Sequence, residues 1–442
     1  MKKAPLTHRF ARHLLYTLAG ASALAAHTAV ADTYSWVPTT GGNWDLTTAN
    51  WNDGASTTAW VNGSGNTAYF NPFGAGATVT LTTNIVTGTL TTNGGATMVL
   101  NGAGTLDVQN ISTAGVSGSS GSIDLFAKLT GNHGLSYSST GTVNNQGRLN
   151  VKVAADYTGD TTLSGTAYVL SDNVSNALPV TTTLNMSSGT TFRIAKNNIT
   201  QEIAGLSGSG TVSATTTGNV LTIRTKSGTT TAYTGSLNSS TALSVVIAGA
   251  GTQTLGGSNL NYNGTTTVSS GTLLLAGSLN NTSSVTVSGG TLQSNAADIK
   301  LGAGMVSMSA GIIDIRGTAP GKFTLSVNQN LATTGGVIKF DLGTGTDQIA
   351  GSGTGAFSLA DTTLAFTLGV GFSYANTYAL FSGFSSGSFS NLTFTGYDSA
   401  NYTASLSNAG VLSFTAVPEP STIALGALGV ALIAFRLRRR TV

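Results

Sequence analysis

Regularly spaced glycines that each open a short alternating stretch are the feature that most constrains how this chain folds. Gly271, Gly290, Gly311 and Gly336 follow one another at intervals of 19, 21 and 25 residues. Self-similarity at such a period indicates stacked units, because one unit cannot bury its apolar side chains alone. Each interval has room for two or three short strands and their turns. We therefore predict an all-β fold in which the chain winds as a solenoid.

The strands are predicted by alternation of apolar and polar residues. In residues 337–342, Ile338, Phe340 and Leu342 alternate with polar residues, and the same period of two recurs at 284–287 and at 363–368, where Leu368 is the last apolar residue. This pattern is typical of strands with one buried face. No stretch outside the two ends has helical periodicity with caps, so we expect very little helix.

The composition excludes several classes of protein. Charged residues make up 8% of the chain and hydrophobic ones 40%, whereas disordered chains combine high charge with low hydrophobicity. Residues 32–416 contain eleven basic and fifteen acidic residues, a net charge of −4, which argues against a nucleic-acid partner. The chain has no cysteine, which removes disulfides, thiolate metal sites and a cysteine nucleophile.

Residues 1–31 have the form of a secretory signal. A basic start precedes the apolar stretch 14–26, and Ala29 and Ala31 form a small-x-small cleavage site. We expect a signal helix, export through Sec-type machinery, and a mature chain that starts near Asp32.

The C-terminal segment 417–442 has three parts in a fixed order. Pro418, Glu419 and Pro420 come first, and the prolines keep the glutamate in extended backbone. An apolar run of 13 residues, 423–435, follows and barely reaches the length of a bilayer core. The segment ends in a cluster of arginines: Arg436, Arg438, Arg439 and Arg440. The positive-inside preference would hold these arginines in the cytoplasm and leave the body outside the inner membrane.

This order of features resembles the PEP-CTERM sorting signal of Gram-negative bacteria. The resemblance implies recognition by a membrane protease of the exosortase type, which removes the segment during delivery to the cell surface or extracellular matrix. It also implies transient insertion in the inner membrane. A permanent single-span anchor is the alternative.

Two segments of the body resemble the autotransporter-associated β-strand repeat. Residues 157–170 and 262–275 share a Tyr-x-Gly start, a Thr-Thr pair and a Gly-Thr step. The resemblance implies a right-handed parallel β-helix. With it, the expected organisation is a signal peptide, a Trp-rich cap, solenoid repeats, C-terminal coils or cap, and the sorting signal: 1–31, 32–75, 76–330, 331–416 and 417–442.

All four tryptophans lie close together near the predicted mature start: Trp36, Trp44, Trp51 and Trp60. We favour a cap, because the first turn of a solenoid exposes apolar side chains and unpaired strand edges that large aromatic rings can cover. The alternative is a platform of exposed rings that contacts sugar.

Few residues suit catalysis or metal binding. His133 is the one histidine of the predicted mature chain and lies in a turn-like stretch. The close carboxylate pairs are Asp156 with Asp160 and Asp341 with Asp347, each around glycine-containing turns. Residues 342–350 match a calcium-binding nonapeptide in one copy, although such sites need tandem copies. We therefore predict no catalytic residue, no cofactor and no metal.

The sequence predicts an exported structural or adhesive β-solenoid without enzymatic activity. Its Thr-, Ser- and Asn-rich surface suits many weak contacts to extracellular polysaccharide. The alternative is a protein that binds or degrades polysaccharide on the same scaffold, since the fold does not determine the activity.

Overall fold

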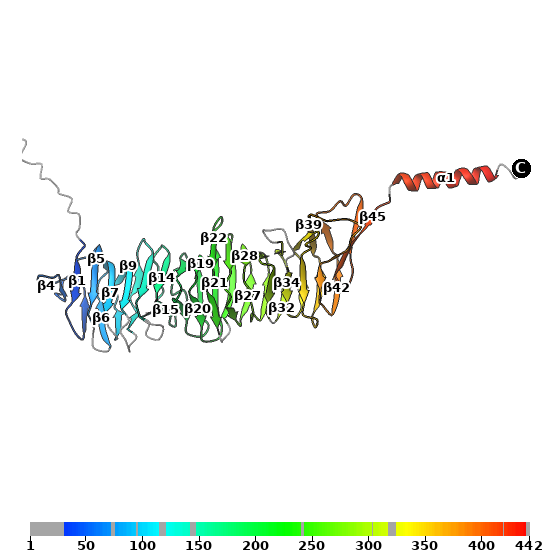
Figure 1. The fold of residues 1–442 in the computed structure, drawn as a ribbon. Helices are drawn as coiled ribbons and strands as arrows, with labels where there is room; N and C mark the ends of the chain where they lie inside the picture. Colours follow the sequence, from blue (N-terminus) through cyan, green and yellow to red (C-terminus); the bar gives the residue numbers. More distant parts are fainter. Residues whose placement is uncertain are drawn as a thin grey trace, which may run out of the picture.

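The computed structural model describes residues 31–71, 76–93, 96–114, 121–141, 147–239, 243–302, 304–316, 324–418 and 420–438. Over these residues the chain forms an elongated β-solenoid with a single helix at its C-terminal end (Figure 1). The predicted all-β solenoid is therefore confirmed. The expected signal helix and Ala29 lie outside the described residues.

The first face of the solenoid is one continuous sheet that runs from end to end. Its strands pair in parallel, except that β1, β3 and β4 pair antiparallel at the N-terminal end. Two strands, β11 and β12, both pair with β9 and not with each other. Its strands, in order along the rod, are β4 (Thr57–Thr58), β3 (Trp51–Asn52), β1 (Thr33–Trp36), β5 (Gly63–Phe70), β7 (Ile85–Asn93), β9 (Thr105–Ala114), β11 (Lys128–Thr130), β12 (Leu135–Ser139), β14 (Thr161–Gly165), β16 (Thr183–Met186), β19 (Gly205–Gly208), β22 (Thr230–Tyr233), β25 (Thr252–Leu255), β28 (Thr272–Leu275), β30 (Thr291–Ser294), β33 (Ile312–Asp314), β36 (Val337–Leu342), β39 (Thr363–Leu368) and β43 (Thr393–Thr395).

The second face is a parallel sheet continued by a single bridging residue. Leu279 pairs with Leu260 on one side and with Leu301 on the other, and so joins the two parts of the face. Its strands are β2 (Gly41–Trp44), β6 (Ala77–Leu81), β8 (Thr97–Asn101), β10 (Ser122–Leu125), β13 (Arg148–Val151), β15 (Tyr168–Ser171), β17 (Thr191–Ile194), β20 (Thr211–Ala214), β23 (Ser236–Ser239), β26 (Leu260–Tyr262), β31 (Asp298–Leu301), β34 (Thr324–Val327), β37 (Gln348–Gly351) and β41 (Phe381–Ser382).

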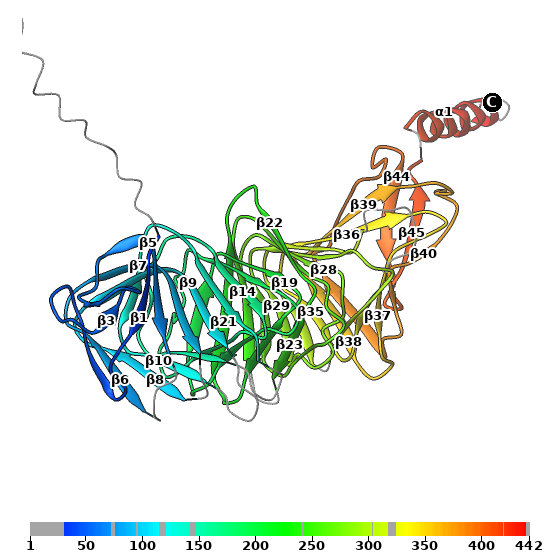
Figure 2. The same cartoon turned by 60° about the vertical axis from the view of Figure 1, so that its left-hand side comes forward.

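A third parallel sheet completes the cross-section from Thr200 onward, and Figure 2 shows the strands stacked along the rod. Its strands are β18 (Thr200–Ile203), β21 (Asn219–Thr225), β24 (Leu243–Gly249), β27 (Thr265–Val268), β29 (Ser284–Val287), β32 (Met305–Met308), β35 (Leu331–Thr333), β38 (Ala356–Ala360) and β42 (Ser386–Ser390). The far end carries a small antiparallel sheet of β40 (Tyr378–Ala379), β45 (Val411–Ala416) and β44 (Tyr402–Leu406).

The spaced glycines stack on one another along the rod. The N–H of Ile312 donates to the carbonyl of Gly290, and the N–H of Val337 donates to that of Gly311. A Cβ built on Gly311 would lie 2.3 Å from the Gly290 carbonyl oxygen, and Gly311 has a φ of +86°. Only glycine fits both the backbone conformation and the close approach. This column explains the glycine periodicity.

Alternation predicted the core well. Ile338, Phe340 and Leu342 are all buried in β36, as are the valines of β29. The expectation fails at Leu368, which is 38% exposed. The next strand, β43, pairs only with Thr363–Ala365 of β39, so Leu368 extends beyond the last turn that could cover it.

The two repeat-like segments bury the same polar contact. The hydroxyl of Tyr262 lies 2.6 Å from that of Thr266, which lies 3.0 Å from the hydroxyl of Thr282 in the next turn. Tyr157 and Thr161 repeat this contact at 2.6 Å, and Thr161 continues to Thr182 of the following turn. These hydroxyls satisfy one another inside the rod, as buried polar groups must.

Candidate functional site

The four tryptophans form a buried cluster at the N-terminal end of the rod. Trp36, Trp44, Trp51 and Trp60 are each 5% exposed or less. Their ring centroids lie 4.9 to 5.3 Å apart in tilted and edge-to-face pairs, an arrangement typical of aromatic packing. Their burial beside the first strands is what a cap requires. It leaves no exposed ring face for a sugar, so the sugar-contact interpretation of these residues is wrong.

Asp45 fixes the turn that follows Trp44 in this cap. Its carboxylate accepts hydrogen bonds from the backbone N–H groups and the hydroxyls of Thr47 and Thr48. Burial by itself would raise the pKa of Asp45, but these four hydrogen bonds lower it to about 2. The group is therefore a structural anchor that stays ionised at neutral pH.

The two carboxylates of the first predicted pair, Asp156 and Asp160, have different partners. Asp156 pairs with Lys128, whereas Asp160 accepts a hydrogen bond from the backbone N–H of Thr183 at 3.1 Å. His133 pairs with Asp107 on the neighbouring turn. These contacts link adjacent turns of the solenoid.

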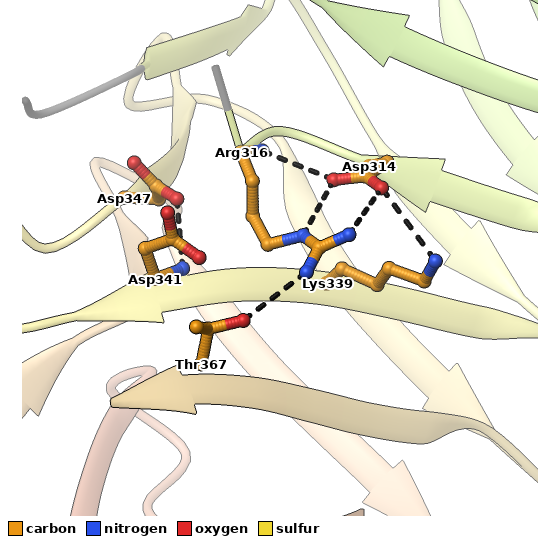
Figure 3. Close-up of polar contacts among 6 residues, drawn as sticks. All are labelled: Asp314, Arg316, Lys339, Asp341, Asp347 and Thr367. Carbon is orange, nitrogen blue, oxygen red and sulfur yellow. Dashed lines mark hydrogen bonds and ion pairs between the residues drawn. The ribbon is translucent and has the colours of Figure 1, made fainter. Parts of the chain in front are cut away.

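Asp341 and Asp347 belong to a turn near a charged cluster on the first face (Figure 3). Asp347 accepts a hydrogen bond from the backbone N–H of Asp341 at 2.8 Å, and Asp341 O accepts one from Asp347 N at 3.1 Å. This is the geometry of a self-bonded turn. Within the described residues, no group of three or more metal-ligating side chains is close enough to hold an ion.

The charged cluster beside that turn is centred on Asp314. Arg316 donates to both oxygens of this carboxylate at 2.9 and 2.8 Å, and Lys339 lies 3.6 Å from it. The second arm of Arg316 reaches across β36 to the hydroxyl of Thr367 at 3.1 Å (Figure 3). Both carboxylate oxygens of Asp314 are thus occupied. The contacts of the cluster join β33, β36 and β39 to one another.

A groove on the second face of the rod is a candidate binding site. It has a volume of about 410 Å³ and is lined by side chains and turns from four successive turns of the rod. Asn280, Asn328 and Ser352 lie in the turns, and Lys300 and Ser326 lie side by side on paired strands. Among its described lining residues none is Asp or Glu. The described lining residues of the groove therefore offer amide, hydroxyl and ammonium groups for binding.

The tail is separate from the rod. Helix α1 (Pro420–Arg438) follows β45 after a short connection that contains exposed Pro418, and it extends away from the sheets (Figures 1 and 2). Its apolar side chains are exposed, including Leu425 at 75% and Phe435 at 67%. Arg436 and Arg438 lie in its last turn, whereas Glu419, Arg439 and Arg440 lie outside the described residues. Such a helix needs an apolar partner, because it buries almost nothing by itself.

Comparison with protein families finds a match to the PEP-CTERM protein-sorting motif over residues 416–440. The tail is a PEP-CTERM sorting motif. This motif implies an exported protein that is held transiently at the membrane and processed by an exosortase-type protease. In the described part of the chain, no helix is both long enough and apolar enough to span a membrane. No curated protein and no solved structure matches the chain significantly.

The PEP-CTERM match begins at the last residue of β45, so the motif and the rod do not overlap beyond Ala416. The other predicted processing site is equally accessible: Ala31 and Asp32 are exposed and precede β1. The sequence located the C-terminal motif because its signal is contiguous. It missed the groove, whose residues come from four turns, and the charged cluster around Asp314, in which Lys339 and Thr367 meet Asp314 and Arg316 only through strand pairing.

Proposed function

We propose that this chain is a non-catalytic structural or adhesive rod delivered to the cell surface or extracellular matrix of a Gram-negative bacterium. Sec-type machinery would export it, and an exosortase-type protease would remove the tail. The observation that carries the proposal is the junction at Ala416, where a capped β-rod ends and the sorting motif begins. A rod with both ends covered is a spacer or a contact surface by shape alone.

Extracellular polysaccharide is the proposed contact. The groove on the second face is open along the rod, is lined by Asn, Ser and Lys, and lacks an acidic pair. These features favour binding over hydrolysis, because glycoside hydrolysis commonly needs two carboxylates across the scissile bond. Weak contacts repeated over several turns would supply affinity through multiplicity.

We also propose that the two Tyr-Thr units belong to the autotransporter-associated type of repeat. The support is structural: both place a buried tyrosine hydroxyl on the threonine four residues later and continue to a threonine of the next turn. A conserved internal contact of this kind would keep each unit in register with its neighbour.

The sorting proposal is tested by replacing Pro418, Glu419 and Pro420 together with alanine. The native protein recovered from the cell surface should start near Asp32 and lack the tail by intact mass. The triple variant should keep its tail and remain with the membrane fraction. Thr415→Ala is the matched control, since Thr415 is exposed and lies just before the motif. A triple variant processed like the control would contradict the proposal.

The non-catalytic role is tested with a glycan-binding screen in which the same samples are assayed for hydrolysis products. Binding without new reducing ends or unsaturated products is expected. Release of either product, abolished by heat denaturation of the protein, would establish an enzyme and overturn the proposal.

A further inference from the structure

Two arginines on the second face enclose a tyrosine ring. The guanidinium carbon of Arg148 lies 5.3 Å from the ring centroid of Tyr168, and that of Arg193 lies 5.1 Å from the same centroid. Arg148 and Tyr168 are paired neighbours on β13 and β15, and Arg193 lies on the next strand, β17. The three residues therefore form a stack, named here the Arg-Tyr-Arg stack, along the axis of the rod.

The tyrosine is covered although it points outward. Tyr168 pairs with Arg148 and Thr191 on the outer side, while Leu149, Val169 and Phe192 point inward. Its exposed fraction is nevertheless only 6%. Contact between a guanidinium and an aromatic face is favourable and restricts the long arginine side chain. The guanidinium groups are thus held in place before any ligand arrives.

Neither arginine of the stack has a carboxylate partner among the described residues. Arg148 makes no ion pair, and Arg193 makes only a long contact of 3.5 Å with the Ser213 hydroxyl. The other two arginines of the rod behave differently: Arg224 pairs with Glu202 at 2.9 Å and Arg316 pairs with Asp314 at 2.8 Å.

The acids near the stack are already engaged. Asp124 accepts a hydrogen bond from Asn150 at 2.5 Å, and Asp172 pairs with Lys152. The stack therefore places two positive charges, without an ion-pair partner in the described part of the chain, on a body whose net charge, these arginines included, is −4. A local excess of cations against that background attracts anions to this part of the second face.

The spacing of the two cations points to a polymer. β13 and β17 are separated by two strand spacings, or about 10 Å at 4.7–4.9 Å per strand. One carboxylate or phosphate cannot bridge such a distance with bidentate contacts to both groups. A chain that carries anionic groups at regular intervals can meet both. Farther along the same face, the groove contains one further cation, Lys300.

We propose that the Arg-Tyr-Arg stack is a binding site for an acidic polysaccharide, whose carboxylates engage Arg148 and Arg193 while the chain follows the rod axis toward the groove. This inference rests on the proposed function and specifies it, because it names the charge class of the polysaccharide and the residues that select it.

The test measures binding of the full chain to immobilised polygalacturonate and to the same polymer after complete methyl esterification, which removes the charge and keeps the backbone. We expect binding to the acidic form only, with weakening as salt is raised. The double variant Arg148→Gln/Arg193→Gln should bind about fivefold more weakly, as expected for two exposed ion pairs of about 0.5 kcal/mol each.

The matched control is Arg224→Gln/Lys226→Gln, which removes the same charge from exposed positions on and just after β21. It should bind like the native protein. Equal weakening in both double variants, or none in either, would overturn the inference. Equal affinity of the native protein for polyglutamate would assign the site to an acidic polypeptide and also overturn it.

A second measurement needs no variant and so does not depend on folding of the substituted protein. Polygalacturonate should protect Arg148 and Arg193 from modification by phenylglyoxal, read by peptide mass spectrometry, and should leave Arg224 unprotected relative to the ligand-free sample. Equal protection of all three arginines, or protection of none of them, would contradict the proposed site. Binding of neutral glycans with the stack unprotected would leave the proposed function standing and remove this inference alone.

Discussion

Replacing Gly311 with alanine tests whether the glycine column sets the close spacing of the turns. Gly311 has a φ of +86°, and a Cβ there would lie 2.3 Å from the Gly290 carbonyl oxygen. The backbone conformation alone costs an alanine about 1–2 kcal/mol. The oxygen must also move, which weakens its hydrogen bond from Ile312 N–H and costs about 1 kcal/mol more. We expect a total of about 3 kcal/mol.

The matched control is Gly353→Ala. Gly353 has a similar φ of +94°, but no heavy atom lies within 4 Å of its added Cβ. This variant should therefore lose only the conformational part, about 1–2 kcal/mol. The difference between the two variants isolates the steric contact between turns.

Hydrogen exchange followed by mass spectrometry is the appropriate assay, because the solenoid can open locally and a global melting temperature averages over all turns. In Gly311→Ala the segments 312–314 and 337–339 should exchange roughly 150-fold faster, which corresponds to about 3 kcal/mol. In Gly353→Ala these segments should be unchanged. Equal effects of the two substitutions on their own neighbourhoods would refute the steric argument.

Three further outcomes follow from the core and the cap. Trp51→Ala should destabilise the N-terminal turns by about 3–5 kcal/mol, seen as faster exchange confined to that end; loss spread evenly along the rod would contradict the cap. Tyr262→Phe should cost about 1 kcal/mol in chemical denaturation, since Thr266 keeps its contact with Thr282, and an unchanged midpoint would contradict the role of the hydroxyl. The pKa of Asp45 is lower in the folded than in the unfolded state, so its ionised carboxylate stabilises the fold fully above pH about 4, and this contribution is lost as pH falls toward about 2. Asp45→Asn should remove that part of the pH dependence of the free energy of unfolding, measured by urea unfolding at each pH.

Much of the architecture was readable from local pattern. The alternation in 337–342 predicted which side chains of β36 are buried, because a strand on a solenoid has one inner face throughout. The glycine intervals predicted the stacking of turns, because each turn must return the chain to the same corner. Leu368 escaped prediction because its exposure depends on where the following strand ends.

The candidate sites were harder to predict from the sequence, because they too depend on how strands from different turns are placed against each other. Arg148, Tyr168 and Arg193 are separated by 20 and 25 residues, and their contact depends on the register that each intervening turn imposes. Because the turns differ in length, alignment by a fixed repeat does not place these three side chains together. The tryptophans lie close together in sequence, but the question of their exposure required the fold, since a cap and a sugar platform need the same residues.

The short connection between β45 and α1 separates the segment that folds as a rod from the segment that directs sorting. In the described part of the chain, every strand pairing of the rod ends at or before Ala416, and the helix shares no ladder with it. Cleavage after Ala416 would therefore leave the fold of the solenoid unchanged. The rod can fold first and lose its sorting motif afterwards.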